Sequence, residues 1–471
     1  MNENARLSAH LRFDRGTLLR DTPPPAEDAA YWTWDSRVEG YRCDAIHYAA
    51  LAPAAREDGA AYGSGAGRWQ AVTWPAPALP PLRPDQEAAV QAWLRTKRGV
   101  LVMPTGTGKT EVALRLMAEL SVSTLVVAPV RDLMYQWHQR IQERLGYDAG
   151  IIGDNTFNKR AVSVTTYDSA CIHMPAFGDE FGLLIFDECH HLPGPIRADA
   201  ARMSLAPHRL GLTATPERSD GRETDLEALI GPVVYRYPLA DARGKTLADY
   251  DVVRIPVYLS PEEQARYDDC AATIRSFMAA KRKTDKGYDG IDLRRDWATD
   301  IEARRVLEAM RVKESIEDRA REKLRVLEDL FRLHAGKRVL VFTQTNVMAR
   351  EVSCRFLVPC LLHHCRKKER RDALDGFRDG RYPALVANQV LDEGVDIPDA
   401  KIAVVLGGLA SAKQAKQRLG RVLRKRGDLR AILYEVVCQE TRDAIRSRLR
   451  RRSDAYAGTR HLRDSGKLRP A

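Results

Sequence analysis

The segment VLVMPTGTGKTEVAL, residues 100–114, constrains the fold of this chain more than any other. An apolar run, a glycine-containing turn and a helical pattern from about Lys109 follow one another, as where a buried strand leads into a helix. Backbone N–H groups at such a helix start can bind phosphate. Met103 replaces the first glycine of Gly-x-x-x-x-Gly-Lys-Thr, so a chance Gly-Lys-Thr in a turn is the alternative. The strand–turn–helix context favours a phosphate site.

Short apolar runs alternate with helical patterns over much of the chain. Buried runs between helices are typical of a parallel sheet that is covered on both faces. The pattern stops and later resumes, which predicts two α/β domains, and 471 residues allow two to four domains. The runs lie at 100–104, 124–129, 162–167 and 183–188, and again at 338–343, 384–388, 403–406 and 431–437.

Three other segments have a different character. Five prolines between Pro75 and Pro84 predict a linker that forms neither helix nor internal strand. Residues 11–19 and 31–43 contain short β-like pieces. From Pro261 to Leu333 the chain predicts charged helix with almost no strand. Within it, one helix is expected to bury an apolar face formed by Ile316, Ala320, Leu324, Leu327 and Phe331.

Composition excludes several classes of protein. Hydrophobic residues make up 44% and charged residues 30%, which suits a globular rather than a disordered or membrane protein. The charged amino-terminal residues predict no secretory signal. Eight scattered cysteines suit a reducing cytosol, so we expect a cytoplasmic protein with no membrane partner. A net charge of +11 favours a polyanionic partner, but an arginine-rich composition without any partner explains it equally well.

The run LLIFDECHH places two carboxylates at the end of a buried strand. In open α/β sheets this edge is where ligands bind. Asp187 is placed to hold Mg²⁺, and Glu188 can orient and deprotonate a water that attacks a phosphoanhydride. An acidic pair that only caps the following turn is the alternative, which the nearby phosphate loop disfavours.

Asp187-Glu188-Cys189-His190, with Thr213-Ala214-Thr215 downstream, resembles motifs II and III of superfamily-two helicases. Further motifs follow in the order typical of that family, and the resemblance covers residues 82 to 440. They are a glutamine motif at Gln86, motif Ia at 128–137, motif Ib at Thr165-Thr166-Tyr167, motif IV at 339–344, motif V at 391–398 and motif VI at 417–424.

This resemblance implies ATP and Mg²⁺ as cofactors and assigns residues to each task. Catalysis would involve Lys109, Asp187, Glu188, Gln417, Arg421 and Arg424. The metal ligands would be Thr110 and Asp187. Nucleotide binding would involve Arg83, Gln86, Thr105, Gly106, Thr107, Gly108, Lys109, Thr110 and Asp396. Contact with DNA, or coupling to it, would involve Gln136, Thr166, His190, Thr213, Thr215, Arg218 and Asp220.

The two motif VI arginines also make physical sense. Phosphoryl transfer spreads negative charge over the equatorial oxygens, and a guanidinium offers planar, always-charged donors to them. Arg421 and Arg424 lie three residues apart, so on a helix they would share one face. Both could then reach a nucleotide held by Lys109. A basic solvated helix is the alternative.

Within the superfamily, DECHHLPG and LTATPERSDGR resemble the archaeal and bacterial XPB-type helicases rather than the RNA-directed DEAD-box group. The XPB-type group carries an Arg-Glu-Asp element, and the equivalent run here, Arg218-Ser219-Asp220, has serine at its centre. It also has a helical thumb, which residues 261–333 resemble. There, phosphate contact is expected from the lysines and arginine of 281–286 and base stacking from Tyr288 and Trp297, although a solvated loop fits that segment equally well.

These observations predict an α/β fold: two RecA-like parallel-sheet domains, a helical thumb-like insertion and a small N-terminal α+β domain. We expect a damage-recognition-like domain at 1–74, a proline-rich linker at 75–81 and an ATP-binding RecA-like domain at 82–240. A connecting strand and the thumb would follow at 241–333, with the second RecA-like domain at 334–471.

The function implied by the resemblance is an ATP-dependent helicase or translocase on double-stranded or forked DNA, with 3′→5′ polarity, in DNA repair. A motor subunit of a nuclease-containing complex is the first alternative, since archaeal XPB relatives work with a nuclease partner. An RNA helicase and a DNA-binding scaffold with a degenerate ATPase are further alternatives. The cluster Cys360, His363, His364 and Cys365 suggests zinc, but three consecutive ligands on a strand cannot converge on one tetrahedral ion.

Overall fold

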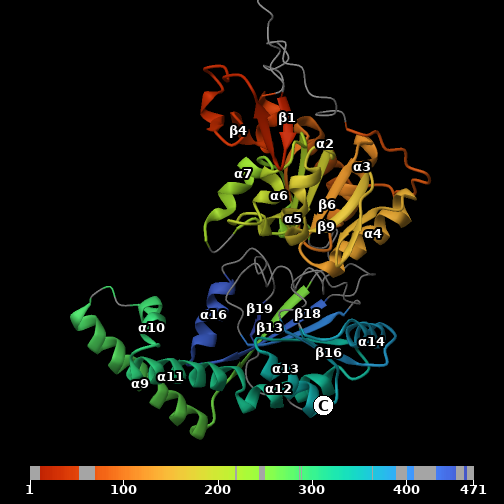
Figure 1. The fold of residues 1–471 in the computed structure, drawn as a ribbon. Coiled ribbons are helices and arrows are strands. Elements are labelled where there is room, and N and C mark those ends of the chain that lie inside the picture. The colour runs from red at the N-terminus through yellow and green to blue at the C-terminus, as the bar shows by residue number, and fades with distance from the viewer. Residues whose placement is uncertain are drawn as a thin grey trace, which may run out of the picture. The chain divides into compact units, whose positions relative to one another are not determined.

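The computed structural model describes residues 11–51, 69–217, 220–242, 250–285, 287, 289–362, 364–388, 400–407, 431–451 and 461–463. These residues form two compact units, one up to residue 242 and the other from residue 250 (Figure 1). No helix among these residues is both long enough and apolar enough to cross a bilayer.

The first unit begins with a small antiparallel sheet. Its apolar side chains, among them Leu18 and Cys43, form a core that also contains Leu205 from the body of the unit. The short strands expected from the amino-terminal sequence are therefore confirmed. In sheet order they are β1 (Leu11–Asp14), β2 (Thr17–Arg20), β4 (Gly40–Asp44) and β3 (Thr33–Asp35).

The body of the first unit is a larger sheet whose paired strands run parallel, except that β8 is antiparallel to β7. All four apolar runs predicted before residue 240 are strands of it. In sheet order it contains β12 (Val233–Arg236), β5 (Arg98–Val102), β11 (His208–Thr213), β10 (Leu183–Asp187), β6 (Thr124–Ala128), β9 (Val162–Thr166), β7 (Gly150–Gly153) and β8 (Thr156–Asn158).

Helices cover both faces of this sheet (Figure 1). Alternate strand residues point to opposite faces, so Leu101 packs into one core while Val100 and Val102 pack into the other. One face is covered by α2 (Pro84–Thr96), α3 (Lys109–Leu120) and α4 (Arg131–Leu145). The other is covered by α5 (Tyr167–Phe177), α6 (Asp199–Arg202) and α7 (Asp225–Leu229), and α8 (Leu239–Ala242) ends the unit.

The prediction that the proline-rich segment forms no helix is wrong at its last residue, Pro84. Residues 75–83 contain neither helix nor strand, as expected, but Pro84 is the first residue of α2. A proline is tolerated there because the first helical N–H has no partner within the helix and the ring fixes a helical φ.

The second unit has a wholly parallel sheet in its described strands. The four apolar runs predicted after residue 333 are among these strands. In sheet order they are β15 (Cys360–Leu361), β16 (Ala384–Ala387), β14 (Val339–Thr343), β17 (Ile402–Leu406), β18 (Ala431–Cys438), β13 (Tyr250–Val257) and β19 (His461–Arg463).

Helices lie on both faces of this sheet too (Figure 1). Val339 and Val341 face the core formed with α12 (Arg321–Leu333) and α13 (Asn346–Phe356). Glu435 of β18 faces the opposite way, where its carboxylate accepts a hydrogen bond from Ser447 of α16 (Arg442–Arg451). The helix α14 (Lys367–Arg378) packs beside β15 and β16.

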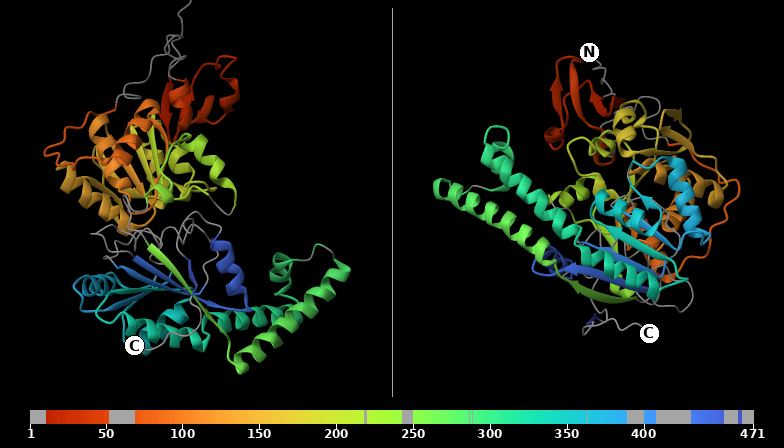
Figure 2. Two further views of the ribbon diagram at one scale, coloured as in Figure 1. Left: turned by 180° about the vertical axis from the view of Figure 1, so that it is seen from behind. Right: turned by 90° about the horizontal axis from the view of Figure 1, so that it is seen from below.

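The segment predicted as a charged helical insertion, residues 261–333, contains α9 (Pro261–Thr284), α10 (Gly290–Asp296) and α11 (Ile301–Asp318), and it ends with α12, which packs in the core of the second sheet rather than in the insertion. A capping box starts α9, in which Ser260 and Glu263 bind each other's backbone N–H groups. The paired helices α9 and α11 extend away from the second sheet, with α10 at their far end (Figures 1 and 2). They have a small core of their own, formed by Ile274, Leu293, Ala303 and Val306.

The prediction that a single helix contains both Ile316 and Phe331 is wrong. The helix α11 ends at Asp318, and Ala320 has an extended ψ of 126° before α12 begins. Lys323 explains the break, because its buried ammonium donates to the carbonyl of Glu317 at the end of α11, at 2.7 Å, and pairs with Asp443 at 3.1 Å. The apolar positions are nevertheless buried or half-buried, as the periodicity predicted.

A fully buried arginine, Arg209, lies at the start of β11. Arg209 has no carboxylate partner within the described residues, and its guanidinium donates instead to backbone carbonyls of the loops around it. Buried carbonyls that lose such a donor destabilise a fold strongly. The acceptors are the carbonyls of Ala201, Ser204, Ala206 and Leu229, at 2.7 to 3.0 Å.

We therefore predict that Arg209→Met lowers the free energy of unfolding of the first unit by about 3 kcal/mol or more, because four carbonyls lose their donor. Chemical denaturation followed by circular dichroism measures this change. Arg202→Ala, which replaces an exposed arginine of the same unit, is the control and should change stability by less than about 0.5 kcal/mol. Equal stability of the two variants would contradict the prediction.

Candidate functional site

The loop between β5 and α3 has a backbone conformation that would suit a bound phosphate. Gly106 and Gly108 both adopt positive φ, 87° and 81°, and α3 begins directly after Gly108. Thr107 folds back on the loop, where its hydroxyl donates to the carbonyl of Pro104 at 2.7 Å. The buried ammonium of Lys109 donates to the carbonyl of Met103 at 3.1 Å. The lysine therefore lies over the loop, where a phosphate group would be bound.

The start of α2 is docked on this loop. The side-chain amide of Gln86 donates to the carbonyl of Thr107 at 3.2 Å, and Arg83 donates to the same carbonyl. Gln86 in turn accepts the backbone N–H of Arg83 at 3.0 Å. A Cβ on Gly108 would lie 2.4 Å from the Gln86 amide nitrogen, so this close approach requires glycine. Arg83 and Gln86, two of the residues expected to bind nucleotide, are thus joined to the phosphate loop.

Asp187 ends β10 in a buried position with three fixed neighbours. The indole N–H of Trp137 donates to Oδ2 at 2.9 Å, and the backbone N–H of Glu188 donates to Oδ1 at 3.0 Å. Tyr167 donates its hydroxyl to the Asp187 carbonyl at 3.0 Å. Burial, and next the charge of Glu188, raise the pKa of Asp187 to about 6, while Trp137 and Lys109 oppose that rise. The carboxylate is therefore held in one orientation but is costly to ionise.

Glu188 lies beside the loop lysine. Its Oε1 is 4.0 Å from Nζ of Lys109, and its backbone has a left-handed φ of 46°, which a non-glycine residue rarely adopts. Its Oε2 is buried without a hydrogen-bond partner and lies 3.5 Å from Nδ1 of His190. A strained residue with an unsatisfied carboxylate oxygen is typical of a functional site.

A chain of polar contacts continues from Glu188 to the end of β11. Nδ1 of the buried His190 is 3.0 Å from the hydroxyl of Thr213, which donates to the carbonyl of Thr215 at 2.9 Å. The backbone N–H of Met103 donates to the carbonyl of Thr213 at 2.9 Å. The residues expected to couple hydrolysis to DNA thus contact both the acidic pair and the phosphate loop.

The oxygen donors around the loop fit a hard cation. Thr110 offers a hydroxyl on the first turn of α3, and Asp187 offers a carboxylate at the neighbouring strand end. The hydroxyl of Thr105 is buried and, like Oε2 of Glu188, lacks a hydrogen-bond partner. Mg²⁺ prefers one or two such protein oxygens together with water and substrate phosphates. Within the described residues, no group of three or more His, Cys, Asp or Glu gathers as a metal site.

The contacts of the other expected site residues do not by themselves indicate a function. Gln136 is half-buried on α4. Thr166 caps α5 by accepting the backbone N–H of Ser169 at 3.3 Å, and Asp220 accepts the backbone N–H of Arg222 at 3.3 Å. Several expected residues lie outside the described residues, namely Arg218, Asp396, Gln417, Arg421 and Arg424.

In the helical insertion, Lys281 pairs with Asp300 at 3.0 Å and Asp296 at 3.5 Å. Trp297 is half exposed, as a base-stacking residue would need to be. Lys286 and Tyr288 lie outside the described residues.

The suggested zinc cluster is only partly described. Cys360 lies on β15, and Cys365 receives the backbone N–H of Leu362 at a distance of 3.2 Å. Nε2 of His364 is 2.9 Å from the guanidinium of Arg350. His363 lies outside the described residues.

Sequence reasoning missed the role of Trp137 and Tyr167, which lie within the segments that resemble motifs Ia and Ib. Both are buried and both donate to Asp187. A buried indole or phenol needs an acceptor, which was the available signal, but its partner lies 50 or 20 residues away along the chain. The sequence alone gives no means of choosing that partner.

Three protein families match parts of this chain. The family described as Type III restriction enzyme, res subunit, matches residues 79–218, and the helicase conserved C-terminal domain matches residues 322–426. The xeroderma pigmentosum group B helicase damage recognition domain matches residues 11–63, which include the small antiparallel sheet.

Among curated relatives, the DNA 3′-5′ translocase XPB2 of Sulfurisphaera tokodaii is 41% identical over 79% of this chain and 84% of its own length. The DNA 3′-5′ helicase XPB of Kineococcus radiotolerans is 32% identical over 77% of this chain, which spans only 60% of that protein. Among solved structures, the Hef helicase domain of Pyrococcus furiosus matches 77% of this chain and 97% of its own, at 16% identity and a TM-score of 0.47. By its similarity to XPB2 over most of both proteins, this chain belongs to the XPB family of superfamily-two helicases.

Proposed function

We propose that this chain is an ATP-driven motor that moves along duplex or forked DNA, or opens it, with 3′→5′ polarity. The observation that carries the proposal is the meeting of Lys109 and Glu188 at the phosphate loop, beside the buried Asp187. Relatives that match 77 to 79% of this chain are named DNA 3′-5′ translocase and helicase. Those names support DNA as the track, and we propose duplex DNA as its form and ATP as the fuel.

In the proposed reaction, Lys109 leaves the Met103 carbonyl and binds the phosphates of ATP, which neutralises charge that develops in the transition state. Glu188 orients the attacking water and takes its proton. Thr110 and Asp187 would hold Mg²⁺, which would neutralise charge on the phosphate oxygens. Trp137 keeps the Asp187 carboxylate turned to one position.

The contacts from Glu188 through His190 to Thr213 offer a route from hydrolysis to movement. A change in the charge or position of Glu188 would alter its electrostatic interaction with the imidazole of His190, which lies 3.5 Å away. A shift of that imidazole would in turn act on the end of β11. We propose that this path links ATP turnover to the DNA-contacting residues around Thr166, Thr215, Arg218 and Asp220.

The second domain completes the proposed motor. Arg421 and Arg424 would stabilise charge on the transferred phosphoryl group, and Gln417 and Asp396 would contact the nucleotide. The helical insertion would hold DNA as a thumb, through phosphate contacts and Trp297. We further propose a cytosolic setting, which suits eight cysteines that are all free thiols, and a role in DNA repair.

The nuclease partner and the alternative RNA substrate stay predictions. Pull-down from native lysate followed by a nuclease assay tests the first. Unwinding assays on matched DNA and RNA duplexes test the second, and we expect the DNA duplex alone to be opened.

Replacing the loop lysine should abolish turnover. We predict that Lys109→Ala lowers DNA-stimulated ATP hydrolysis by about 100-fold or more, since the transition state loses a preorganised positive charge. Phosphate release with and without duplex DNA measures the effect. Arg95→Ala, an exposed cation near the end of α2, is the control and should keep the wild-type rate. A wild-type chain whose ATP hydrolysis does not respond to DNA would contradict the motor assignment.

Glu188→Gln should separate binding from turnover. The amide keeps the shape of the side chain but cannot accept a proton, so we expect hydrolysis to fall by about 100-fold or more. Binding of a fluorescent ATP analogue should stay within about threefold of wild type, because the phosphate contacts of Lys109 are kept. Normal hydrolysis by this variant would remove Glu188 as the base.

Trp137→Phe should weaken the metal site. Without the indole N–H, the carboxylate of Asp187 loses a charge-assisted hydrogen bond, so half-maximal ATP hydrolysis should need about tenfold more Mg²⁺. The pKa of Asp187 near 6 also means that protons compete with Mg²⁺ as pH falls below 6. Because Trp137 favours the ionised form, the variant should lose Mg²⁺ affinity at a higher pH than wild type.

The control for this variant is Trp93→Phe, which removes an equally buried indole that donates to the carbonyl of Arg209. Binding of a fluorescent nucleotide, titrated with Mg²⁺ between pH 5.5 and 8, gives a readout that does not depend on turnover. Identical Mg²⁺ titrations for the two variants would show that Trp137 only supports the fold.

A further inference from the structure

The small amino-terminal sheet carries a cavity that the motor reaction does not use. Its volume is about 530 Å³, and its lining comes from β2, β3, β4 and the short turns beside them. The lining side chains that matter below are Tyr31, Arg37, Arg42, Asp44 and His47.

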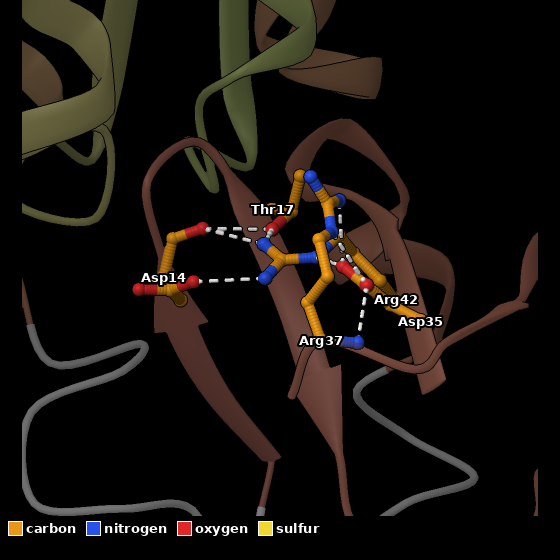
Figure 3. A network of polar contacts seen from close by, with 5 residues as sticks. All are labelled: Asp14, Thr17, Asp35, Arg37 and Arg42. Atoms are coloured by element: carbon orange, nitrogen blue, oxygen red, sulfur yellow. Dashed lines mark hydrogen bonds and ion pairs between the residues drawn. The ribbon is translucent and has the colours of Figure 1, made fainter. Parts of the chain in front are cut away.

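Arg42 lines the cavity and is held by several hydrogen bonds (Figure 3). Its guanidinium donates to the carboxylate of Asp14 at 3.0 Å and to that of Asp35 at 3.0 Å, and it also donates to the hydroxyl of Thr17. These three partners lie on β1, β2 and β3, so this part of the lining is preorganised before any ligand arrives.

A second guanidinium stands at the rim. Arg37 donates from Nε and Nη2 to the two carboxylate oxygens of Asp35, at 2.8 and 2.9 Å (Figure 3). Its side chain is nevertheless 83% exposed. A bidentate pair fixes the plane of the guanidinium, and a fixed, exposed guanidinium plane is a surface on which a flat aromatic group can stack.

An aromatic pair lines another part of the cavity. The ring of Tyr31 is 45% exposed, and its centroid lies 4.6 Å from that of His47. Burial lowers the pKa of His47, so this ring is neutral at pH 7. Tyr31 therefore offers a second planar surface, which is uncharged and supported from one side.

Charge in and around the cavity is nearly balanced. Two cations, Arg37 and Arg42, stand against three carboxylates, those of Asp14, Asp35 and Asp44. Arg37 lowers the pKa of Asp35, which keeps that carboxylate ionised. A phosphate group would gain little electrostatic binding energy in this cavity, because each described cation already has an anionic partner. A flat, uncharged ligand with polar edges fits this lining better.

We propose that this cavity binds one nucleobase that has left the DNA stack, held between Tyr31 and the guanidinium plane of Arg37. The inference rests on the proposed action on DNA and adds a base-directed contact to it. Stacking on side chains is independent of sequence, so the cavity selects DNA with an unstacked nucleotide, such as a fork junction or a bulge.

The test uses the full chain and a duplex with a single extrahelical 2-aminopurine, beside the same duplex fully paired. Wild type should bind the bulged duplex about fivefold or more tightly than the paired one, since one stacked base contributes that much. The fluorescence of 2-aminopurine should change on binding. Tyr31→Ala and Arg37→Ala should lose both effects, whereas Tyr31→Phe should keep them.

Phe157→Ala removes another exposed aromatic of the first unit and should behave as wild type, its side chain being 58% exposed on β8. All variants should keep DNA-stimulated ATP hydrolysis on the paired duplex, which also shows that they fold. Equal wild-type affinity for the two duplexes, or a preference that survives Tyr31→Ala and Arg37→Ala, would overturn the cavity proposal and leave the motor standing. A wild-type chain without DNA-stimulated hydrolysis would instead overturn the proposed function.

Discussion

The ion pair between Lys109 and Glu188, beside the buried Asp187 at the end of β10, is the interaction on which the candidate site depends. Two adjacent carboxylates in a buried position repel each other, and burial alone disfavours their ionised forms. The ammonium at 4.0 Å from Glu188 and the indole bound to Asp187 offset that cost. The parallel sheet makes the arrangement possible, because β5 and β10 both end at the same edge with β11 between them.

Most of the secondary structure could be predicted because its signals are local. Buried strands appear as continuous apolar runs, and the helix after Gly108 follows from its glycine turn. The break between α11 and α12 could not be predicted, because its cause is an ammonium at Lys323 that pairs with Asp443, 120 residues further along. The prediction that Pro84 belongs to the linker failed for a different reason. Proline interrupts the interior of a helix but is favoured at its first position, and Pro84 is the first residue of α2.

The candidate site divides in the same way. The order of the motifs identified Lys109, Asp187, Glu188 and His190 as candidate site residues. The structure brings these four side chains together. Trp137 and the amino-terminal cavity have no comparable signal, because each depends on contacts between residues that lie far apart in the sequence. Their importance comes from partners on other elements, and only coordinates reveal such partners.

The docking of Gln86 on the phosphate loop has a consequence for how fuel is chosen. Its amide already donates to the carbonyl of Thr107 and accepts from the backbone of Arg83 before any nucleotide arrives. One amide proton and one lone pair of Oε1 stay available, so an adenine could bond to Gln86 while the contact with the loop is kept. A base bound there would be joined through a single side chain to the backbone that surrounds the phosphates, so the two ends of the nucleotide would be recognised by one connected element.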